Sequence, residues 1–195
     1  MRIAIDLDNT LCEWQYHWMT LYNFWYGTEL SKADGNDWNA CLDKTHFNTM
    51  SEFYDWFEAA DGWKTQPFVT GAEGFMYDLD RICKDSAGRH SYLFVTSRPT
   101  HLGKMAAHEL VKGLYGAQVA FANDESKGQQ NADIWIDDSP AVLVALAQAG
   151  KKSIRFARPW NSGLRNGDGV PESTHVASTW GQVMDILVHE EGILQ

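Results

Sequence analysis

The chain has 195 residues, of which 44% are hydrophobic and 22% are charged. This length supports one well-filled core with a small addition, and it is too short for two full domains. The 16 basic and 26 acidic residues give a formal net charge of -10. This balance disfavours a protein that coats DNA or RNA, because such binding depends on Lys and Arg side chains that neutralise phosphates.

The number and spacing of the cysteines and the hydropathy of the chain predict the compartment in which the protein is located. Cys12, Cys41 and Cys83 have neither the even count nor the close spacing of a disulfide framework or a zinc site. We expect them to be reduced thiols. No apolar stretch approaches the ~18 residues of a membrane span, and no export signal precedes the first apolar run. The expectation is a cytoplasmic protein that does not interact with membranes.

Short apolar runs bounded by polar residues recur along the chain, and they predict buried strands rather than half-exposed ones. These runs lie at residues 2–6, 92–96, 119–122, 134–137 and 153–156.

Helical patterns alternate with these strands from residue 70 onward. They begin at a T-x-x-E capping box of Thr70 and Glu73, at about Thr100 with an end near Tyr115, at the N-cap Ser139 before Pro140, and at Thr179 with Gln182. The alternation predicts an α/β fold with a doubly wound, mostly parallel sheet, whose ligands bind beyond the carboxyl ends of the strands.

An aromatic-rich segment interrupts this alternation after the first strand. The chain contains nine Trp, seven Tyr and nine Phe, and fourteen of these lie between Trp14 and Trp63. We expect this segment to be helical, with a polar break at residues 31–39. The predicted organisation is therefore a catalytic core at residues 1–12 and 67–195, with a helical cap inserted at residues 13–66.

Polar clusters follow three of the predicted strands. They are residues 6–10, residues 96–98 and the pair Asp137 and Asp138. Four carboxylates that converge at strand ends, those of Asp6, Asp8 and this pair, would repel one another unless a cation neutralised them. Oxygen ligands without nearby His or Cys favour a hard ion, most plausibly Mg²⁺.

The first cluster, Asp6-Leu7-Asp8-Asn9-Thr10, resembles the D-x-D-x-T motif of the haloacid dehalogenase-like phosphohydrolases. Three further motifs follow in that family's order: Thr96 after an apolar strand, Lys127, and the acidic pair ten residues after Lys127. The resemblance covers nearly the whole chain and implies a core of that family's fold.

Within this superfamily the chain is similar to the 5′(3′)-deoxyribonucleotidases. The similarity rests on the compact size, on the insert directly after the first motif, and on Trp160-Asn161 after the last predicted strand. One position departs from the pattern, since those enzymes usually carry Gly after the second Asp of the motif and this chain has Asn9.

The roles expected for the motif residues follow from the chemistry of a phosphate monoester. A carboxylate attacks this anion only where metal and cationic groups offset the charge. Asp6 is the expected nucleophile, and Asp8 the general acid and base, because residues 6 and 8 share one side of a continuing strand. Lys127 would neutralise the nucleophile and a phosphoryl oxygen, and the Thr96 hydroxyl and backbone amides near Ser97 would donate to others.

Metal and substrate contacts complete the expected site. Asp137 and Asp138 would hold Mg²⁺ with Asp6 and the carbonyl of Asp8, and which of the pair is the direct ligand stays open. Arg98 would contact a phosphate or sugar, although a surface charge before Pro99 is an equally good interpretation.

Aromatic residues of the insert are the candidates for contact with a nucleobase. The resemblance implies this role for Trp14. Looser candidates are Trp56, Phe57 and Trp63. The aromatic stripe at helical spacing, formed by Trp18, Tyr22, Trp25 and Tyr26, is expected to be packing core instead.

The favoured function is a Mg²⁺-dependent phosphomonoesterase of deoxyribonucleoside monophosphates, with pyrimidine bases preferred because the resemblance implies it. Its partners would be a small nucleotide and, as in related enzymes, a second copy in a homodimer, with no polynucleotide. A phosphatase of another small metabolite, such as a sugar phosphate, is the alternative. A non-catalytic binding module would have no need of the complete set of motif residues.

Overall fold

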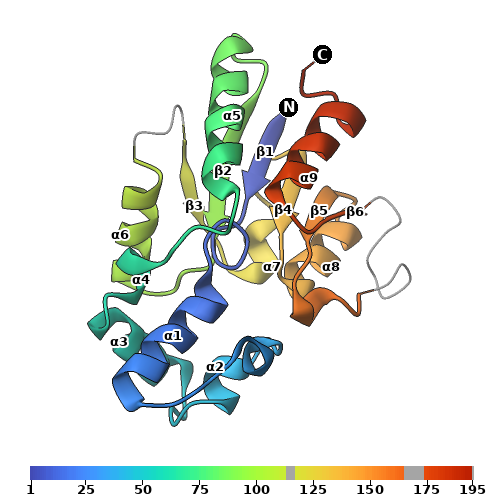
Figure 1. Cartoon of the computed structure of the whole chain (residues 1–195). Coiled ribbons are helices and arrows are strands. Elements are labelled where there is room, and N and C mark those ends of the chain that lie inside the picture. Colours follow the sequence, from blue (N-terminus) through green and yellow to red (C-terminus); the bar gives the residue numbers. More distant parts are fainter. Residues whose placement is uncertain (113–116, 165–173, 195) are drawn as a thin grey trace.

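The structure, a computed structural model, describes residues 1–112, 117–164 and 174–194. Its centre is a parallel sheet with the strand order β3-β2-β1-β4-β5-β6 (Figure 1). The strands are β1 (Arg2–Ile5), β2 (Ser91–Thr96), β3 (Val119–Phe121), β4 (Ile134–Asp137), β5 (Lys152–Phe156) and β6 (Thr174–Ala177). The predicted α/β fold and its five strands are confirmed. The edge strand β6 was not predicted from the sequence.

Helices cover both faces of the sheet. Figure 1 shows α5 and α9 in front of the strands and α8 behind them. The front face packs the larger apolar cluster, which includes Phe75 and Trp180, whereas Val142 and Leu146 of α8 pack behind. These helices are α5 (Ala72–Asp85), α6 (His101–Leu110), α7 (Asp124–Lys127), α8 (Pro140–Gln148) and α9 (Trp180–Asp185), which continues into the π-helical turn η3 (Ile186–Glu190). No helix in the described ranges is long and apolar enough to cross a membrane.

Three of the four predicted helix starts are confirmed. Thr100, Ser139 and Thr179 are N-caps, and each side-chain oxygen accepts a hydrogen bond from the backbone N–H three residues later. The helix that begins at Thr100 ends at Leu110, before the predicted end. Residues 113–115 of that prediction lie outside the described residues.

The predicted capping box of Thr70 and Glu73 is wrong. The helix begins one residue later, at Ala72, and its N-cap is Gly71 with no side-chain cap. Gly71 has a φ of 87°, a left-handed conformation that glycine adopts at no steric cost. The turn geometry at Gly71 therefore replaces the expected side-chain cap.

The aromatic segment forms its own group of helices beyond the carboxyl ends of the strands (Figure 1). Trp18, Tyr22, Phe53 and Phe57 are buried in an apolar cluster of this segment, where each contributes about 1.5–3 kcal/mol by burial. Its elements are α1 (Trp14–Tyr26), the 3-10 turn η1 (Lys32–Gly35) within the predicted polar break, α2 (Ala40–Asp43), α3 (Met50–Ala59) and α4 (Gly62–Thr65).

Two members of the predicted aromatic stripe lie outside that core. Trp25 is 57% exposed and Tyr26 is 45% exposed, so the buried face of α1 does not include its last two residues. Tyr26 still packs on Tyr22, with 4.7 Å between ring centroids.

The insert leaves and rejoins the core through adjacent segments. The Glu13 N–H donates to the Pro67 carbonyl at 2.8 Å, and the Val69 N–H donates to the Leu11 carbonyl at 2.9 Å. Cys12 and Phe68 form an antiparallel bridge between these bonds. The inserted helices are therefore connected to the core by two adjacent segments, residues 11–13 and 67–69.

Candidate active site

Neighbouring strands deliver the predicted motifs to one edge of the sheet. β2, β1 and β4 are adjacent. Thr96 and Asp137 end β2 and β4, and Asp6 directly follows β1. Lys127 reaches the same edge from the end of α7, the short helix after β3. The motifs therefore meet where an open α/β sheet binds its ligands.

Asp6, Asp137 and Asp138 form a buried acidic cluster. One carboxylate oxygen of each lies within 4.8 Å of the others. The Lys127 Nζ donates to Asp6 Oδ1 at 2.6 Å and to Asp137 Oδ2 at 3.1 Å. All four side chains are buried, and one ammonium group faces three carboxylates. The cluster is therefore short of positive charge.

This shortage appears in the pKa values. Burial and the charges of Asp137 and Asp138 raise the pKa of Asp6 well above its ordinary value, although Lys127 opposes the change. Burial and the charge of Asp137 raise the pKa of Asp138 to about 7. Burial acts to lower the pKa of Lys127, but Asp137 and Asp6 outweigh it and raise that pKa. A divalent cation would supply the missing charge, and the all-oxygen donor set suits Mg²⁺.

We expect the metal-free chain to lose stability between about pH 4 and about pH 7. The pKa of Asp138 rises from 3.8 to about 7 on folding. Between these values the folded chain holds a proton that the unfolded chain has lost, so stability falls with rising pH until the folded chain loses that proton as well. The melting temperature against pH checks this. Added Mg²⁺ should remove the fall, and Asp138→Asn should make it smaller without abolishing it, because Asp6 also has a raised pKa. A metal-free melting temperature that rises over this range would contradict the expectation.

Asp138 is fixed by side chains on both of its oxygens. The Thr10 Oγ1 donates to Oδ1 at 3.0 Å, and the Trp160 Nε1 donates to Oδ2 at 2.8 Å. The Asn161 Nδ2 donates to the Asp138 carbonyl at 2.8 Å. Trp160 and Asn161 thus orient a candidate metal ligand. This role was not predicted from the sequence, where the two residues served only as part of the family resemblance.

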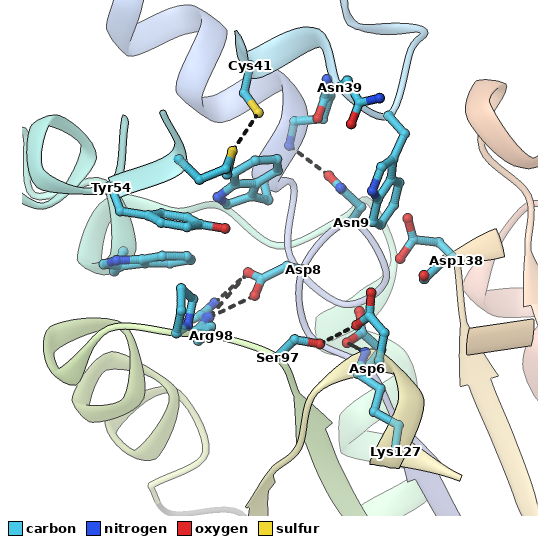
Figure 2. Close-up of a pocket in the computed structure, with 18 residues that line it drawn as sticks. Asp6, Asp8, Asn9, Asn39, Cys41, Tyr54, Ser97, Arg98, Lys127 and Asp138 are labelled. Atoms are coloured by element: carbon cyan, nitrogen blue, oxygen red, sulfur yellow. Dashed lines mark hydrogen bonds and ion pairs between the residues drawn. The ribbon is translucent and has the colours of Figure 1, made fainter. Parts of the chain in front are cut away.

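Asp8 points away from the acidic cluster, contrary to the expectation that it shares a side with Asp6. β1 ends at Ile5, so strand geometry does not relate residues 6 and 8. Figure 2 shows the Asp8 carboxylate turned toward Arg98. Ligation of a metal by the carbonyl of Asp8 stays a prediction.

Arg98 holds Asp8 in this orientation. The Arg98 Nη2 donates to Asp8 Oδ1 at 2.8 Å, and its Nε donates to Oδ2 at 2.9 Å. Burial acts to raise the pKa of Asp8, but the charge and hydrogen bonds of Arg98 outweigh it and lower that pKa. Arg98 itself is only 4% exposed, so its interpretation as a surface charge is wrong.

The hydroxyl groups of the second motif are engaged within the protein. Thr96 is fully buried, and its Oγ1 donates to Asp8 Oδ2 at 3.3 Å. The Ser97 Oγ donates to Asp124 Oδ1 at 2.6 Å. The Thr96 hydroxyl therefore donates to Asp8 in this structure, whereas it was predicted from the sequence to donate to a phosphoryl oxygen.

A pocket of about 310 Å³ lies over the acidic cluster, between the sheet edge and the insert (Figure 2). Asp6, Asp138 and Lys127 contribute to its polar side. All four residues predicted to bind substrate line it, namely Trp14, Trp63, Ser97 and Arg98. Trp56 and Phe57 do not, and Phe57 is buried within the insert.

Several lining residues were not predicted from the sequence. Trp38, Asn39, Tyr54 and Gln15 all face this pocket. Trp38 also packs edge-on against Trp160 of the core, with 6.2 Å between ring centroids. Gln15 lies on α1, Trp38 and Asn39 directly precede α2, and Tyr54 lies on α3, so their approach depends on how the insert packs.

The backbone conformation of Asn9 explains why asparagine can occupy the position at which the deoxyribonucleotidases usually carry glycine. Its φ is 65°, in the left-handed region that glycine favours and asparagine tolerates better than most residues. Its Oδ1 accepts a hydrogen bond from the Gln15 N–H at 2.7 Å. Asn9 therefore keeps the turn after Asp8 and adds a bond to the first turn of α1.

Solved structures share this architecture at low sequence identity. A haloacid dehalogenase-like family hydrolase from Streptococcus pneumoniae has a TM-score of 0.62 and 12% identity, over 95% of this chain and 97% of that chain. The corresponding figures for a haloacid dehalogenase-like family hydrolase from Xanthomonas campestris are 0.58 and 9%, over 100% and 98%. The chain has the haloacid dehalogenase-like fold.

A third structure agrees, a haloacid dehalogenase-superfamily hydrolase of subfamily IA from Geobacter sulfurreducens. Its TM-score is 0.53 at 10% identity, over 95% of each chain. No protein-family model and no curated protein matches the chain. At these identities the likeness establishes the fold, and the resemblance to 5′(3′)-deoxyribonucleotidases stays a prediction.

Proposed function

We propose that the chain is a Mg²⁺-dependent phosphomonoesterase that hydrolyses deoxyribonucleoside monophosphates, with pyrimidine bases preferred. The observation that carries the proposal is the buried cluster of Asp6, Asp137 and Asp138, bridged by Lys127. An aromatic wall beside this cluster, which includes Trp14 and the other lining aromatics, offers flat surfaces to a base. The nucleotide part also rests on the family resemblance.

In the first step an Asp6 oxygen attacks the phosphorus of the ester, and the bond from phosphorus to the leaving oxygen breaks. The leaving oxygen takes a proton from the Asp8 carboxyl group, so the products are an alcohol and an aspartyl phosphate. Lys127 contacts Asp6 Oδ1 at 2.6 Å, and its charge offsets the repulsion between nucleophile and phosphate.

In the second step a water molecule gives a proton to the Asp8 carboxylate while its oxygen attacks the phosphorus. The bond between phosphorus and Asp6 breaks, which releases inorganic phosphate and restores the Asp6 carboxylate. The ion pair with Arg98 lowers the pKa of Asp8 and so keeps its carboxyl group ionised at the start of this step. The first step requires a protonated Asp8 and therefore different contacts.

The three carboxylates of the cluster would hold the metal. Mg²⁺ bound there would offset their charge and that of the phosphoryl oxygens. Thr10 and Trp160 support this role because their hydrogen bonds fix the Asp138 carboxylate, one oxygen of which lies in the cluster.

A panel of phosphate esters tests the proposed substrate class. We expect dUMP and dTMP to be hydrolysed with a higher kcat/KM than sugar phosphates, and a metal chelator to abolish turnover of every ester. Among the described residues that line the pocket, the cations Lys127 and Arg98 are both paired with carboxylates, so a second phosphate on the ester should lower turnover. Faster turnover of sugar phosphates would contradict the nucleotide assignment, and turnover without metal would contradict the metal.

A further inference from the structure

One carboxylate that lines the pocket has no part in the mechanism above. Asp124 is the first residue of α7, and its half-buried side chain faces the pocket. The Ser97 Oγ donates to Asp124 Oδ1 at 2.6 Å, and in Figure 2 Ser97 lies on the same side of the pocket as Asp6. Asp124 is therefore close to the place where the phosphate of an ester would meet Asp6.

The charge of Asp124 has no counter-ion among the described residues. The two described cations that line the pocket are paired with other carboxylates, Arg98 with Asp8 and Lys127 with Asp6. Asp124 also lies outside the acidic cluster, whose carboxylate oxygens come within 4.8 Å of one another. It is therefore not a candidate ligand of a cation bound there, and its negative charge faces the pocket.

This charge acts on groups on both sides of the pocket. Burial acts to lower the pKa of Lys127, but Asp137, Asp6 and, as a smaller cause, Asp124 raise it. On the insert side, burial raises the pKa of Tyr54, and the charge of Asp124 is one of the smaller causes of that rise. In Figure 2 Lys127 and Tyr54 lie on opposite sides of the pocket. A group of a bound ester that lies between them is therefore subject to the same charge.

A role at the start of α7 is the alternative explanation for an acidic residue at this position. Acidic side chains in the first turn of a helix are stabilised by the helix dipole. Glu125 shares this first turn with Asp124, but it is exposed and does not line the pocket. Glu125 is therefore the matched control, because its substitution removes one charge from the same turn without changing the pocket.

We propose that Asp124 is a specificity-determining residue that selects phosphate esters by the charge of their organic part. The role rests on the proposed function, because it concerns the ester that this site binds. The Asp124 carboxylate repels a second anionic group near the phosphate, whereas a hydroxyl or ammonium group can donate a hydrogen bond to it. The deoxyribose of a nucleoside monophosphate carries such a hydroxyl and no second anion. The selected substrates are thus esters with one phosphate and a neutral or cationic organic part.

Three short esters test this selection. Phosphoethanolamine, glycerol 1-phosphate and 3-phosphoglycerate carry an ammonium group, hydroxyl groups and a carboxylate, and their short chains keep these groups near the phosphorus. We expect the wild-type chain with Mg²⁺ to have its highest kcat/KM for phosphoethanolamine and its lowest for 3-phosphoglycerate. Asp124→Asn should reduce the ratio between these two values by about tenfold or more at low ionic strength. The effect of the shared phosphate cancels in this ratio.

Two further variants separate charge from structure. Asp124→Glu, which keeps the charge, should keep the order of the three esters, and Glu125→Gln should leave all three kcat/KM values unchanged. If Asp124→Asn changed the ratio by less than about twofold, or if Glu125→Gln changed it equally, Asp124 would not determine specificity.

Binding distinguishes a failure of this role from a failure of the proposed function. The Asp6→Asn chain should bind the esters without hydrolysing them, and calorimetry with Mg²⁺ gives a Kd for each. We expect the same order of affinities, with a smaller spread when Asp124→Asn is added. If the wild-type chain hydrolysed none of the esters while this order of affinities remained, the phosphatase assignment would fail and selection by Asp124 would be supported. Equal affinities for phosphoethanolamine and 3-phosphoglycerate with Asp124 in place would overturn the selection.

Discussion

Asp6→Asn is expected to lower kcat for phosphate esters by at least about 10⁴-fold, because an amide cannot form the aspartyl phosphate. The fold should survive the change. The amide oxygen can still accept the bond from Lys127, which the Asp6 carboxylate accepts at 2.6 Å. One negative charge also leaves a cluster in which Asp137 and Asp138 already raise the pKa of Asp6. Steady-state turnover of dUMP, measured with the melting temperature of each chain, checks this expectation.

Asp55→Asn is the matched control for this loss. Asp55 is exposed on α3, and the same substitution there should leave turnover unchanged. If Asp6→Asn kept a tenth or more of the wild-type kcat while its melting temperature stayed high, Asp6 would not be the nucleophile.

Lys127→Met is expected to destabilise the metal-free chain by about 3–5 kcal/mol at neutral pH, since it leaves buried carboxylates without their ion pair. Lys127 is 3% exposed and contacts both Asp6 and Asp137. Mg²⁺ should restore part of the stability, because it replaces the lost charge. It should not restore hydrolysis, because one of the two cations that offset the charges of Asp6 and of the phosphate would still be missing. Denaturant unfolding with and without Mg²⁺ measures the first effect, and turnover measures the second.

Lys64→Met is the control for this destabilisation. Lys64 pairs with Asp61 at 2.9 Å on the surface, where their side chains are 71% and 64% exposed. Such a pair contributes only about 0–1 kcal/mol. If both substitutions had equally small effects, the buried cluster would not depend on the Lys127 charge.

The sheet edge that carries the candidate site was largely predictable from the sequence. Buried parallel strands have uninterrupted apolar runs as their sequence pattern. The polar residues that follow these strands, such as Asp6 and Asp137, must meet at one sheet edge because the strands are parallel. Helix starts were predictable where a side chain caps the backbone, as at Ser139. They were not where a left-handed turn does so, as at Gly71.

The contacts between insert and core were not predictable. Asp8 was expected beside Asp6 because local strand geometry was extended past Ile5, where the strand in fact ends. Its actual partners, Arg98 and Gln66, are 90 and 58 residues away along the chain. Such distant pairings depend on how the inserted helices pack against the core. Neither the hydrophobic periodicity of the sequence nor the spacing of its motifs predicts that packing.

Trapping of the intermediate tests the phosphatase assignment most directly. The wild-type chain would be mixed with a turned-over phosphate ester and Mg²⁺, stopped in acid within the first turnover, and its peptides analysed by mass spectrometry. We predict a phosphoryl group on Asp6, absent from the Asp6→Asn chain and from samples treated with a chelator. Turnover with no phosphorylated aspartate, or with the phosphoryl group on another residue, would contradict the mechanism.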